Sequence, residues 1–280
     1  MNKQKPRERL EKTLARVARE QGLDQERLRR WVSFLALCGA LDRAIAAGIL
    51  SGYYLKGGVA MELRFAEHAR ATKDLDLGLE GVRADRLRAL RDALETGFDE
   101  FSFRIKAQTR DMEQADTIRV QVAIQHRTRS WQTIEVDLGP SKADQIDLIE
   151  PQVHGLVELG LPVVSLIRCL SLADQVAQKL HACAGPTAAG RARDVLDILL
   201  IDTLGQLDYV AAANAARRVF SERATHPFPP VFALPPEWRL ELEAMAQELG
   251  FALKAAAEIE RRFLDVIRTL ADSQRPAPSP

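Results

Sequence analysis

Two aspartates separated by one residue, Asp74 and Asp76, offer the clearest chemistry in the sequence. Residues 72–79 alternate as a strand does, so both carboxylates should point to one face while Leu75 and Leu77 point into a core. Two carboxylates a few ångströms apart repel by roughly 4 kcal/mol at an effective dielectric of about 20. Such a pair therefore needs a cation or a shared proton. Oxygen ligands favour Mg²⁺, which also takes substrate phosphates.

A glycine turn lies shortly before these acids. A short apolar run, residues 53–55, ends in Lys56-Gly57-Gly58, and residues 59–68 follow with a helical pattern. Glycine lets the backbone approach a phosphate closely, and the N-terminal end of a helix favours an anion. Turn, helix and acidic strand in this order predict a site for a triphosphate and its metal ion.

A lysine on a later helix is also unusual. Residues 172–183 read as a helix with an apolar stripe, and Lys179 borders or enters that stripe. A buried ammonium is costly without a partner. Lys179 either extends to water or reaches an anion, which could be a phosphate or a carboxylate.

Two more aspartates open the next predicted helix. Asp194 and Asp197 are three residues apart and share a helix face. The simplest interpretation pairs Asp197 with Arg193, four residues earlier. The alternative is that Asp194 meets Lys179 close to a bound nucleotide.

Bulk properties describe a globular chain. It has 280 residues, 46% of them hydrophobic, and a formal net charge of zero, which argues against a uniformly basic nucleic-acid binder. Three cysteines without metal-like spacing indicate reduced, buried thiols. The N-terminus has no apolar signal-peptide core, and no window approaches 18 apolar residues. We therefore expect a cytoplasmic protein with no membrane partner.

The order of elements predicts an α/β (α+β) protein. Strands are expected at residues 101–107, 118–124 and 131–138, with a polar loop over 109–116, which gives a mixed sheet of about five strands. We expect N-terminal helices in residues 1–50, the sheet core in 51–160, and a helical domain that closes the cleft in 161–280. The tail, 273–280, is expected to be disordered.

The motifs together resemble the AbiEii-type nucleotidyltransferase toxins (AbiEii/AbiGii and MenT-like toxins of toxin–antitoxin systems). The resemblance covers about residues 50–205. It rests on the Lys-Gly-Gly turn, the Asp-x-Asp strand, the helix containing Gln175 and Lys179, and the Arg193-Asp194-x-x-Asp197 segment. It implies a polymerase-β-like nucleotidyltransferase core followed by a helical C-terminal domain.

The resemblance also implies a reaction and its partners. The protein would transfer NMP from an NTP to an acceptor, the 3′ end of tRNA or another RNA, using Mg²⁺ (with Mn²⁺ as the alternative). A cognate antitoxin protein would neutralise it.

Site roles follow from the same resemblance. A third carboxylate would come from the strand at 131–138, where the alternation predicts Trp131, Glu135 and Asp137 on one face. Asp137 is our candidate and Glu135 the alternative, unless both are ordinary exposed acids. Arg64 by itself reads as a surface guanidinium, and only the resemblance draws it to the site. The predicted catalytic residues are Asp74, Asp76, Lys179 and Asp194; the metal ligands Asp74, Asp76 and Asp137; and the nucleotide-binding residues Lys56, Gly57, Gly58, Arg64, Thr72 and Gln175.

Two other functions remain open on the sequence. The chain could be a nucleotide-binding regulatory or interaction protein with an inactive nucleotidyltransferase fold. It could also transfer a nucleotidyl group to a protein or a small molecule. The motifs alone do not choose among these acceptors or name the preferred NTP.

Overall fold

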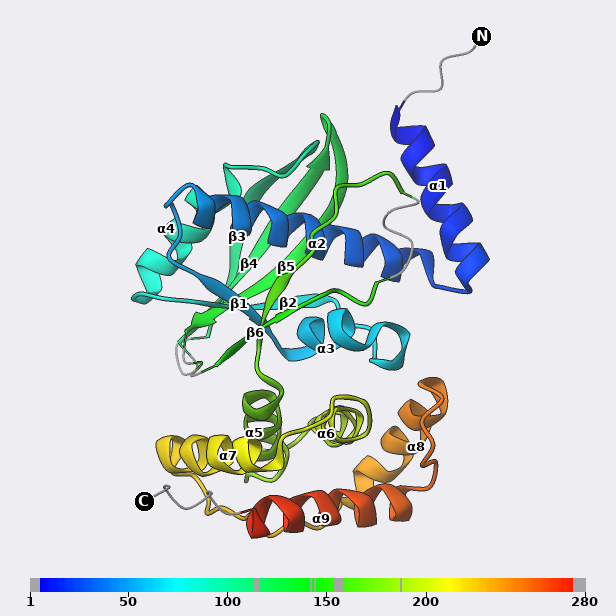
Figure 1. Ribbon diagram of the computed structural model, residues 1–280, viewed down its shortest axis with the longest axis vertical. Helices are drawn as coiled ribbons and strands as arrows, with labels where there is room; N and C mark the ends of the chain where they lie inside the picture. Colours follow the sequence, from blue (N-terminus) through cyan, green and yellow to red (C-terminus); the bar gives the residue numbers. More distant parts are fainter. Residues whose placement is uncertain are drawn as a thin grey trace, which may run out of the picture. The chain divides into compact units, whose positions relative to one another are not determined.

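The computed structural model describes residues 6–112, 116–141, 143, 145–153, 159–186 and 188–273. The chain forms two compact units. The first comprises Met1–Glu67 and Ala71–Cys169, and the second comprises His68–Arg70 and Leu170–Pro280. Each unit is described by itself (Figure 1).

The first unit contains a mixed seven-stranded sheet in the order β3-β4-β5-β2-β1-β7-β6. β2 is antiparallel to β1 but parallel to β5, which makes the sheet mixed, as predicted. The expected number of about five strands was too low, because β6 and β7 have only four residues each and show no long alternation. The strands are β1 (Tyr53–Lys56), β2 (Asp74–Leu79), β3 (Phe101–Met112), β4 (Thr117–His126), β5 (Arg129–Pro140), β6 (Ile146–Ile149) and β7 (Ile167–Leu170).

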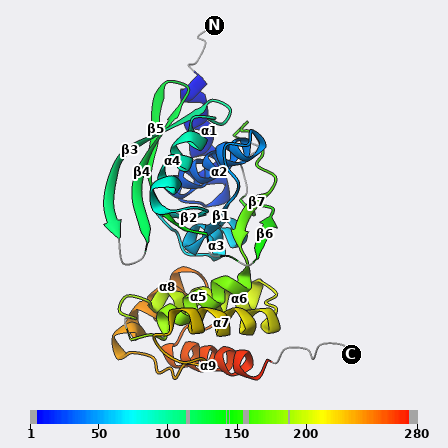
Figure 2. The same ribbon diagram turned by 90° about the vertical axis from the view of Figure 1, so that its left-hand side faces the viewer.

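Helices cover one face of this sheet (Figure 2). The long helix α2 begins after Asp24, which caps it: its carboxylate accepts a hydrogen bond of 2.7 Å from the Arg27 N–H. The helices of this unit are α1 (Pro6–Gln21), α2 (Gln25–Ala46), α3 (Gly57–Phe65), the 3₁₀ turn Ala66–His68, which runs into the second unit, and α4 (Arg83–Leu94).

The apolar core lies between the sheet and α2. Leu75, Leu77 and Leu79 of β2 join one buried cluster with Trp31 and Phe34 of α2. The alternate residues of β2, including Asp74 and Asp76, are half-buried on the opposite face. The sequence pattern of β2 therefore decided which face carries acids.

Two details of the sheet differ from the sequence prediction. β3 continues to Met112, so the loop predicted over 109–116 begins later than expected; residues 113–115 lie outside the described part. The β4–β5 register shifts between Ile124 and Gln125, which leaves Trp131 as an extra residue in β5. This bulge turns Trp131 into the core, where it is 5% exposed, and not onto the face of Asp137 as predicted.

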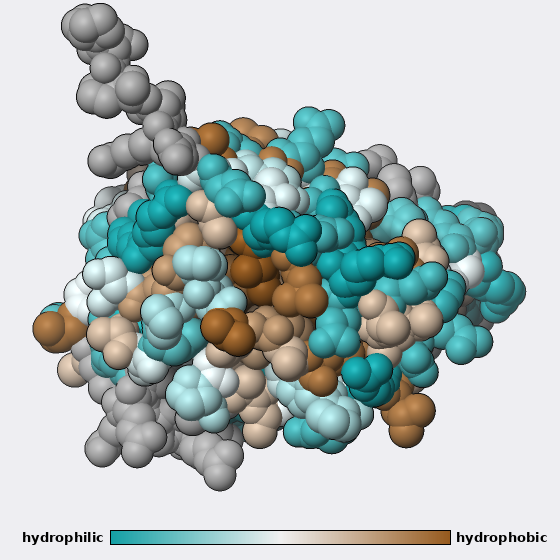
Figure 3. Space-filling model, turned by 90° about the horizontal axis from the view of Figure 1, so that it is seen from below, coloured by the Kyte–Doolittle hydropathy of each residue, from teal (hydrophilic) through white to brown (hydrophobic). Residues whose placement is uncertain are grey.

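The second unit is helical. Its helix α5 (Leu172–Cys183) has the predicted bounds and is capped by Ser171, whose hydroxyl accepts from the Asp174 N–H. Figure 3 shows apolar residues gathered on one face of the molecule within a hydrophilic border. The predicted tail lies outside the described residues from 274 onward. The remaining elements are α6 (Ala192–Leu204), α7 (Tyr209–Arg223), the 3₁₀ turn Pro236–Trp238, α8 (Arg239–Glu248) and α9 (Ala256–Asp272).

Within the described residues, no helix has the length and apolar character needed to cross a membrane.

Candidate active site

Four charged residues form a row across four neighbouring strands. Lys56 of β1 pairs in register with Asp76 of β2, and Asp76 pairs with Asp137 of β5. Asp137 in turn lies opposite Arg119 of β4. Because directly paired residues point to the same side of a sheet, this row places two carboxylates between two cations.

A second row lies two residues along the strands. Asp74 of β2 pairs in register with Glu135 of β5, on the same face as Asp76 and Asp137. The Asp74 side chain is 41% exposed and that of Asp137 only 14% exposed. The sequence prediction that Asp74 and Asp76 share a face, and that Asp137 comes to them from a neighbouring strand, matches this register.

Arg119 is the site residue that the sequence analysis missed. Its Nε and Nη2 donate to the two carboxylate oxygens of Asp137, each at 2.6 Å. Its guanidinium also lies 3.4 Å from Glu135 and 3.6 Å from Asp74. Hydrogen bonding to Asp137 raises the pKa of Arg119 well above its usual value, against the opposing effect of burial. Arg119 is therefore a fixed positive charge among the acids.

The donor set fits one hard divalent cation. The two rows carry four carboxylates (Asp74, Asp76, Glu135 and Asp137) and two cations (Lys56 and Arg119), which leaves two negative charges. All the acidic donors are oxygens, which suits Mg²⁺. Within the described residues, however, no three His, Cys, Asp or Glu side chains form a group that could hold a metal. The predicted three-carboxylate site is thus not assembled, and the role of Asp137 as a ligand stays a prediction.

Gly57 brings the turn against Asp76. Its φ is +62°, and an added Cβ would lie 2.0 Å from the Asp76 Oδ2. Only glycine fits such a position, because an L side chain would meet both backbone strain and a clash. Gly57 and Gly58 begin α3, and the side chain of its N-cap residue, Lys56, makes no capping hydrogen bond. The first N–H groups of α3 lie beside the acids, at a helix end that favours an anion.

Lys56 reaches over the neighbouring strands. An added Cβ on Gly139 of β5 would lie 2.8 Å from the Lys56 Nζ, so this glycine makes room for the ammonium group. The Tyr54 ring covers Gly78 in the same way, and its hydroxyl donates to the Pro140 carbonyl at 3.4 Å. Two glycines thus let β1 side chains lie flat over β2 and β5.

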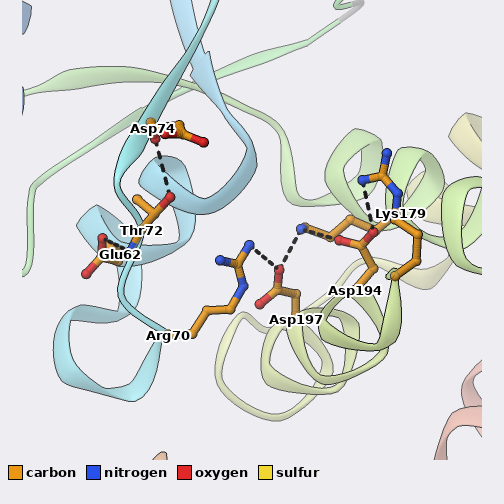
Figure 4. Close-up of polar contacts among 8 residues, drawn as sticks. Glu62, Arg70, Thr72, Asp74, Lys179, Asp194 and Asp197 are labelled. Carbon is orange, nitrogen blue, oxygen red and sulfur yellow. Dashed lines mark hydrogen bonds and ion pairs between the residues drawn. The ribbon is translucent and has the colours of Figure 1, made fainter. Parts of the chain in front are cut away.

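A fully buried acid, Glu62, holds the segment before β2 (Figure 4). Its carboxylate accepts hydrogen bonds from the Thr72 N–H at 2.9 Å, the Arg27 Nε at 2.7 Å and the Trp31 Nε1 at 3.1 Å. The Thr72 hydroxyl then donates to the Asp74 carbonyl at 3.3 Å. Burial raises the pKa of Glu62, although these donors oppose that shift. The sequence prediction did not include this residue; the signal was an acid among the apolar residues 59–63.

Arg64 points elsewhere on the first unit. Its guanidinium donates to Asp147 of β6 at 2.8 Å, and its side chain is 9% exposed. β6 is the edge strand beyond β1 and β7. Arg64 is therefore not the surface guanidinium read from sequence alone, and its predicted nucleotide contact stays a prediction.

A second polar cluster lies within the helical unit (Figure 4). The Lys179 Nζ donates to Asp197 at 2.6 Å and to Asp194 at 3.1 Å, and all three residues are buried. Arg70, from the short His68–Arg70 segment, lies 3.5 Å from the same Asp197 oxygen. Lys179 therefore does not extend to water. Asp197 pairs with Lys179 and Arg70 and not, as the simplest interpretation had it, with Arg193.

Two polar groups of this cluster, one N–H of Lys179 and the Asp194 Oδ2, have no hydrogen-bond partner among the described residues. Burial tends to lower the pKa of Lys179, but Asp197 and Asp194 outweigh it and raise the pKa overall. An ammonium has three N–H donors, and the two carboxylates take two of them. The Asp194 Oδ2 is buried without a hydrogen bond from any described residue, and the Arg191 guanidinium lies 3.6 Å away.

Gln175 lies on the same helix as Lys179 but is only 2% exposed. Its Nε2 donates to the Leu170 carbonyl at 3.2 Å, which ties α5 to the end of β7. Its Oε1 is buried and has no hydrogen-bond partner in the described part of the chain. The predicted nucleotide contact of Gln175 remains a prediction.

The mixed sheet, the glycine turn at the start of α3, the paired acids of β2 and the helical unit make an α/β fold similar to that of a nucleotidyltransferase. Comparison with protein families gives the narrower identity. The family described as "Nucleotidyl transferase AbiEii toxin, Type IV TA system" matches residues 39–272. The chain therefore belongs to the AbiEii nucleotidyltransferase toxin family, as the sequence motifs indicated.

The fold has a counterpart among solved structures. The chain is similar to MenT4, a nucleotidyltransferase toxin from Mycobacterium tuberculosis H37Rv, with a TM-score of 0.62 and 17% identity over 93% of this chain and 90% of that one. A weaker likeness, with a TM-score of 0.40 and 16% identity over 69% of this chain and 94% of the other, links it to the antibiotic-resistance factor ANT(2'')-Ia. No curated protein matches the sequence.

Proposed function

We propose that this protein transfers NMP from an NTP to the 3′ end of a tRNA, in a reaction that requires Mg²⁺. The observation that carries the proposal is the position of Gly57, which sets the N-terminus of α3 directly against Asp76. An anion-binding helix end next to paired carboxylates suits a triphosphate and its counter-ion.

In the first unit, Asp74 and Asp76 would hold the metal ion. When bound, Mg²⁺ neutralises charge on the triphosphate and polarises the phosphoryl group. The backbone N–H groups of Gly57 and Gly58 donate to phosphate oxygens, and Lys56 adds positive charge. Thr72, fixed by Glu62, sets the start of the acidic strand.

In the reaction, an acceptor hydroxyl oxygen attacks the α-phosphorus of the NTP. The bond between that phosphorus and the bridging oxygen breaks, and pyrophosphate leaves with that electron pair. In the helical unit, the third N–H of Lys179 donates to an anionic oxygen. Asp194 orients Lys179 or, through its Oδ2, accepts the proton of the hydroxyl group. Most of the acceleration comes from positioning and charge neutralisation.

The family name implies a toxin, and we propose that a cognate antitoxin protein restrains this one in the cytoplasm. Binding an RNA acceptor requires contacts with its phosphates, and these contacts weaken as the salt concentration rises. In a chain of zero net charge, such contacts must come from local groups of arginine and lysine.

The test supplies α-³²P-labelled NTPs, one at a time, with total RNA, total protein and small-molecule acceptors. We expect Mg²⁺-dependent labelling of the tRNA fraction, and a loss of at least about 100-fold in Asp76→Asn. An exposed acid outside the two acidic rows, as in Glu67→Gln, is the matched control, and this variant should transfer label normally. If the label instead moves to a protein or a small molecule, that molecule replaces tRNA as the assigned acceptor. No transfer to any acceptor, with either Mg²⁺ or Mn²⁺, would refute the enzyme assignment and favour an inactive, nucleotide-binding protein.

A further inference from the structure

Arg119 places its guanidinium among three carboxylates of the two rows. It binds both oxygens of Asp137 at 2.6 Å and lies within 3.6 Å of Asp74 and 3.4 Å of Glu135. Its position is fixed by the β4–β5 register, in which Arg119 lies directly opposite Asp137. A bidentate guanidinium–carboxylate pair is both directional and strong.

A metal ion would have to displace this pair in order to use Asp137 as a ligand. The Asp137 side chain is 14% exposed and that of Arg119 is 28% exposed, so the pair is partly shielded from water. Breaking such a pair leaves a shielded charge without its partner, which is strongly unfavourable. Mg²⁺ also gives up its own water reluctantly. These terms act together against recruitment of Asp137 by the metal.

Charge balance points the same way. With Lys56 and Arg119 included, the four acids of the two rows retain two negative charges, which is the charge that one divalent ion neutralises. A second divalent ion would leave the face with excess positive charge before the nucleotide arrives.

We propose that Arg119 is a positioning residue that replaces the second cation, so that the site takes one metal ion, on Asp74 and Asp76, while Asp137 anchors Arg119. This inference rests on the proposed function, because it assumes that Asp74 and Asp76 bind a divalent ion. It sets the expected metal count at one and removes Asp137 from the predicted ligand set.

The test counts Mn²⁺ on the full chain by electron paramagnetic resonance, with a non-hydrolysable NTP analogue present. We expect one Mn²⁺ per wild-type chain. Asp137→Asn should keep one Mn²⁺ and change its Kd by less than about threefold, whereas Asp76→Asn should weaken it by at least about tenfold. Arg119→Gln should allow a second Mn²⁺, and Arg119→Lys should return the count to one.

The possible failures are distinguishable. Two Mn²⁺ on the wild type, or loss of the ion in Asp137→Asn, would overturn the inference and leave the proposed function standing. No Mn²⁺ on the wild type would overturn both. If Arg119→Gln does not fold, as judged by circular dichroism, the wild-type count and Asp137→Asn still decide the question.

Discussion

Replacing Gly57 by alanine should damage the site more than it damages the fold. At φ +62°, an L residue costs about 1–2 kcal/mol more than glycine. The new Cβ would also lie 2.0 Å from the Asp76 Oδ2, whereas carbon and oxygen in contact are about 3.3 Å apart. The carboxylate must therefore move by roughly 1 Å, a displacement that can reduce an enzyme rate by about 100-fold.

Gly22 supplies a matched control. Its φ is +67°, and an added Cβ meets nothing within 4 Å, so Gly22→Ala has the backbone strain without the clash. Urea denaturation should show a loss of about 1–2 kcal/mol in both variants. Mn²⁺ binding and nucleotidyl transfer should fall only in Gly57→Ala. Equal metal affinity in the two variants would refute the argument that Gly57 exists to admit Asp76.

Three further changes test the rest of the structure. Lys179→Met should destabilise the helical unit by about 3–5 kcal/mol, because Asp194 and Asp197 lose their main cation, while Lys254→Met should have little effect; equal unfolding midpoints would contradict this. Glu62→Gln should cost about 1–3 kcal/mol by weakening the bonds to Arg27 and Thr72, and an unchanged urea midpoint would show that its charge is not needed. Burial, followed by Arg223 and His226, lowers the pKa of His181 to about 4. Between about pH 6.5 and 4 the unfolded chain, with a histidine pKa of about 6.5, binds a proton that the folded chain does not. The free energy of unfolding therefore keeps its full value above about pH 6.5 and falls by up to about 3 kcal/mol toward pH 4. His181→Asn should flatten this pH dependence; a profile identical to that of the wild type would remove His181 as its source.

Local patterns in the sequence were reliable where one segment decides its own structure. The stripe of residues 172–183 predicted α5 with its observed bounds. The alternation around Asp74 and Asp76 fixed which face of β2 is apolar. These features depend on side-chain periodicity and on hydrogen bonds to neighbours a few residues away.

The errors arose where the partner lay far along the chain. The strands β6 and β7 are too short to alternate visibly and exist because they pair with the sheet edge. The bulge at Trp131 depends on the register between β4 and β5, and no pattern within β5 predicts it. Arg193 looked like the partner of Asp197 from spacing alone, yet Lys179 and Arg70 hold that carboxylate.

The sequence by itself determined the chemical inventory of this protein: a glycine turn, paired acids on one strand face, and a lysine at the apolar stripe of a helix. Only the tertiary structure decided how these charges are balanced. It paired Arg119 with Asp137, the Glu62 carboxylate with the Thr72 N–H, and Asp197 with Lys179. Periodicity reports which way a side chain points, but strand register and helix packing determine which charge it meets.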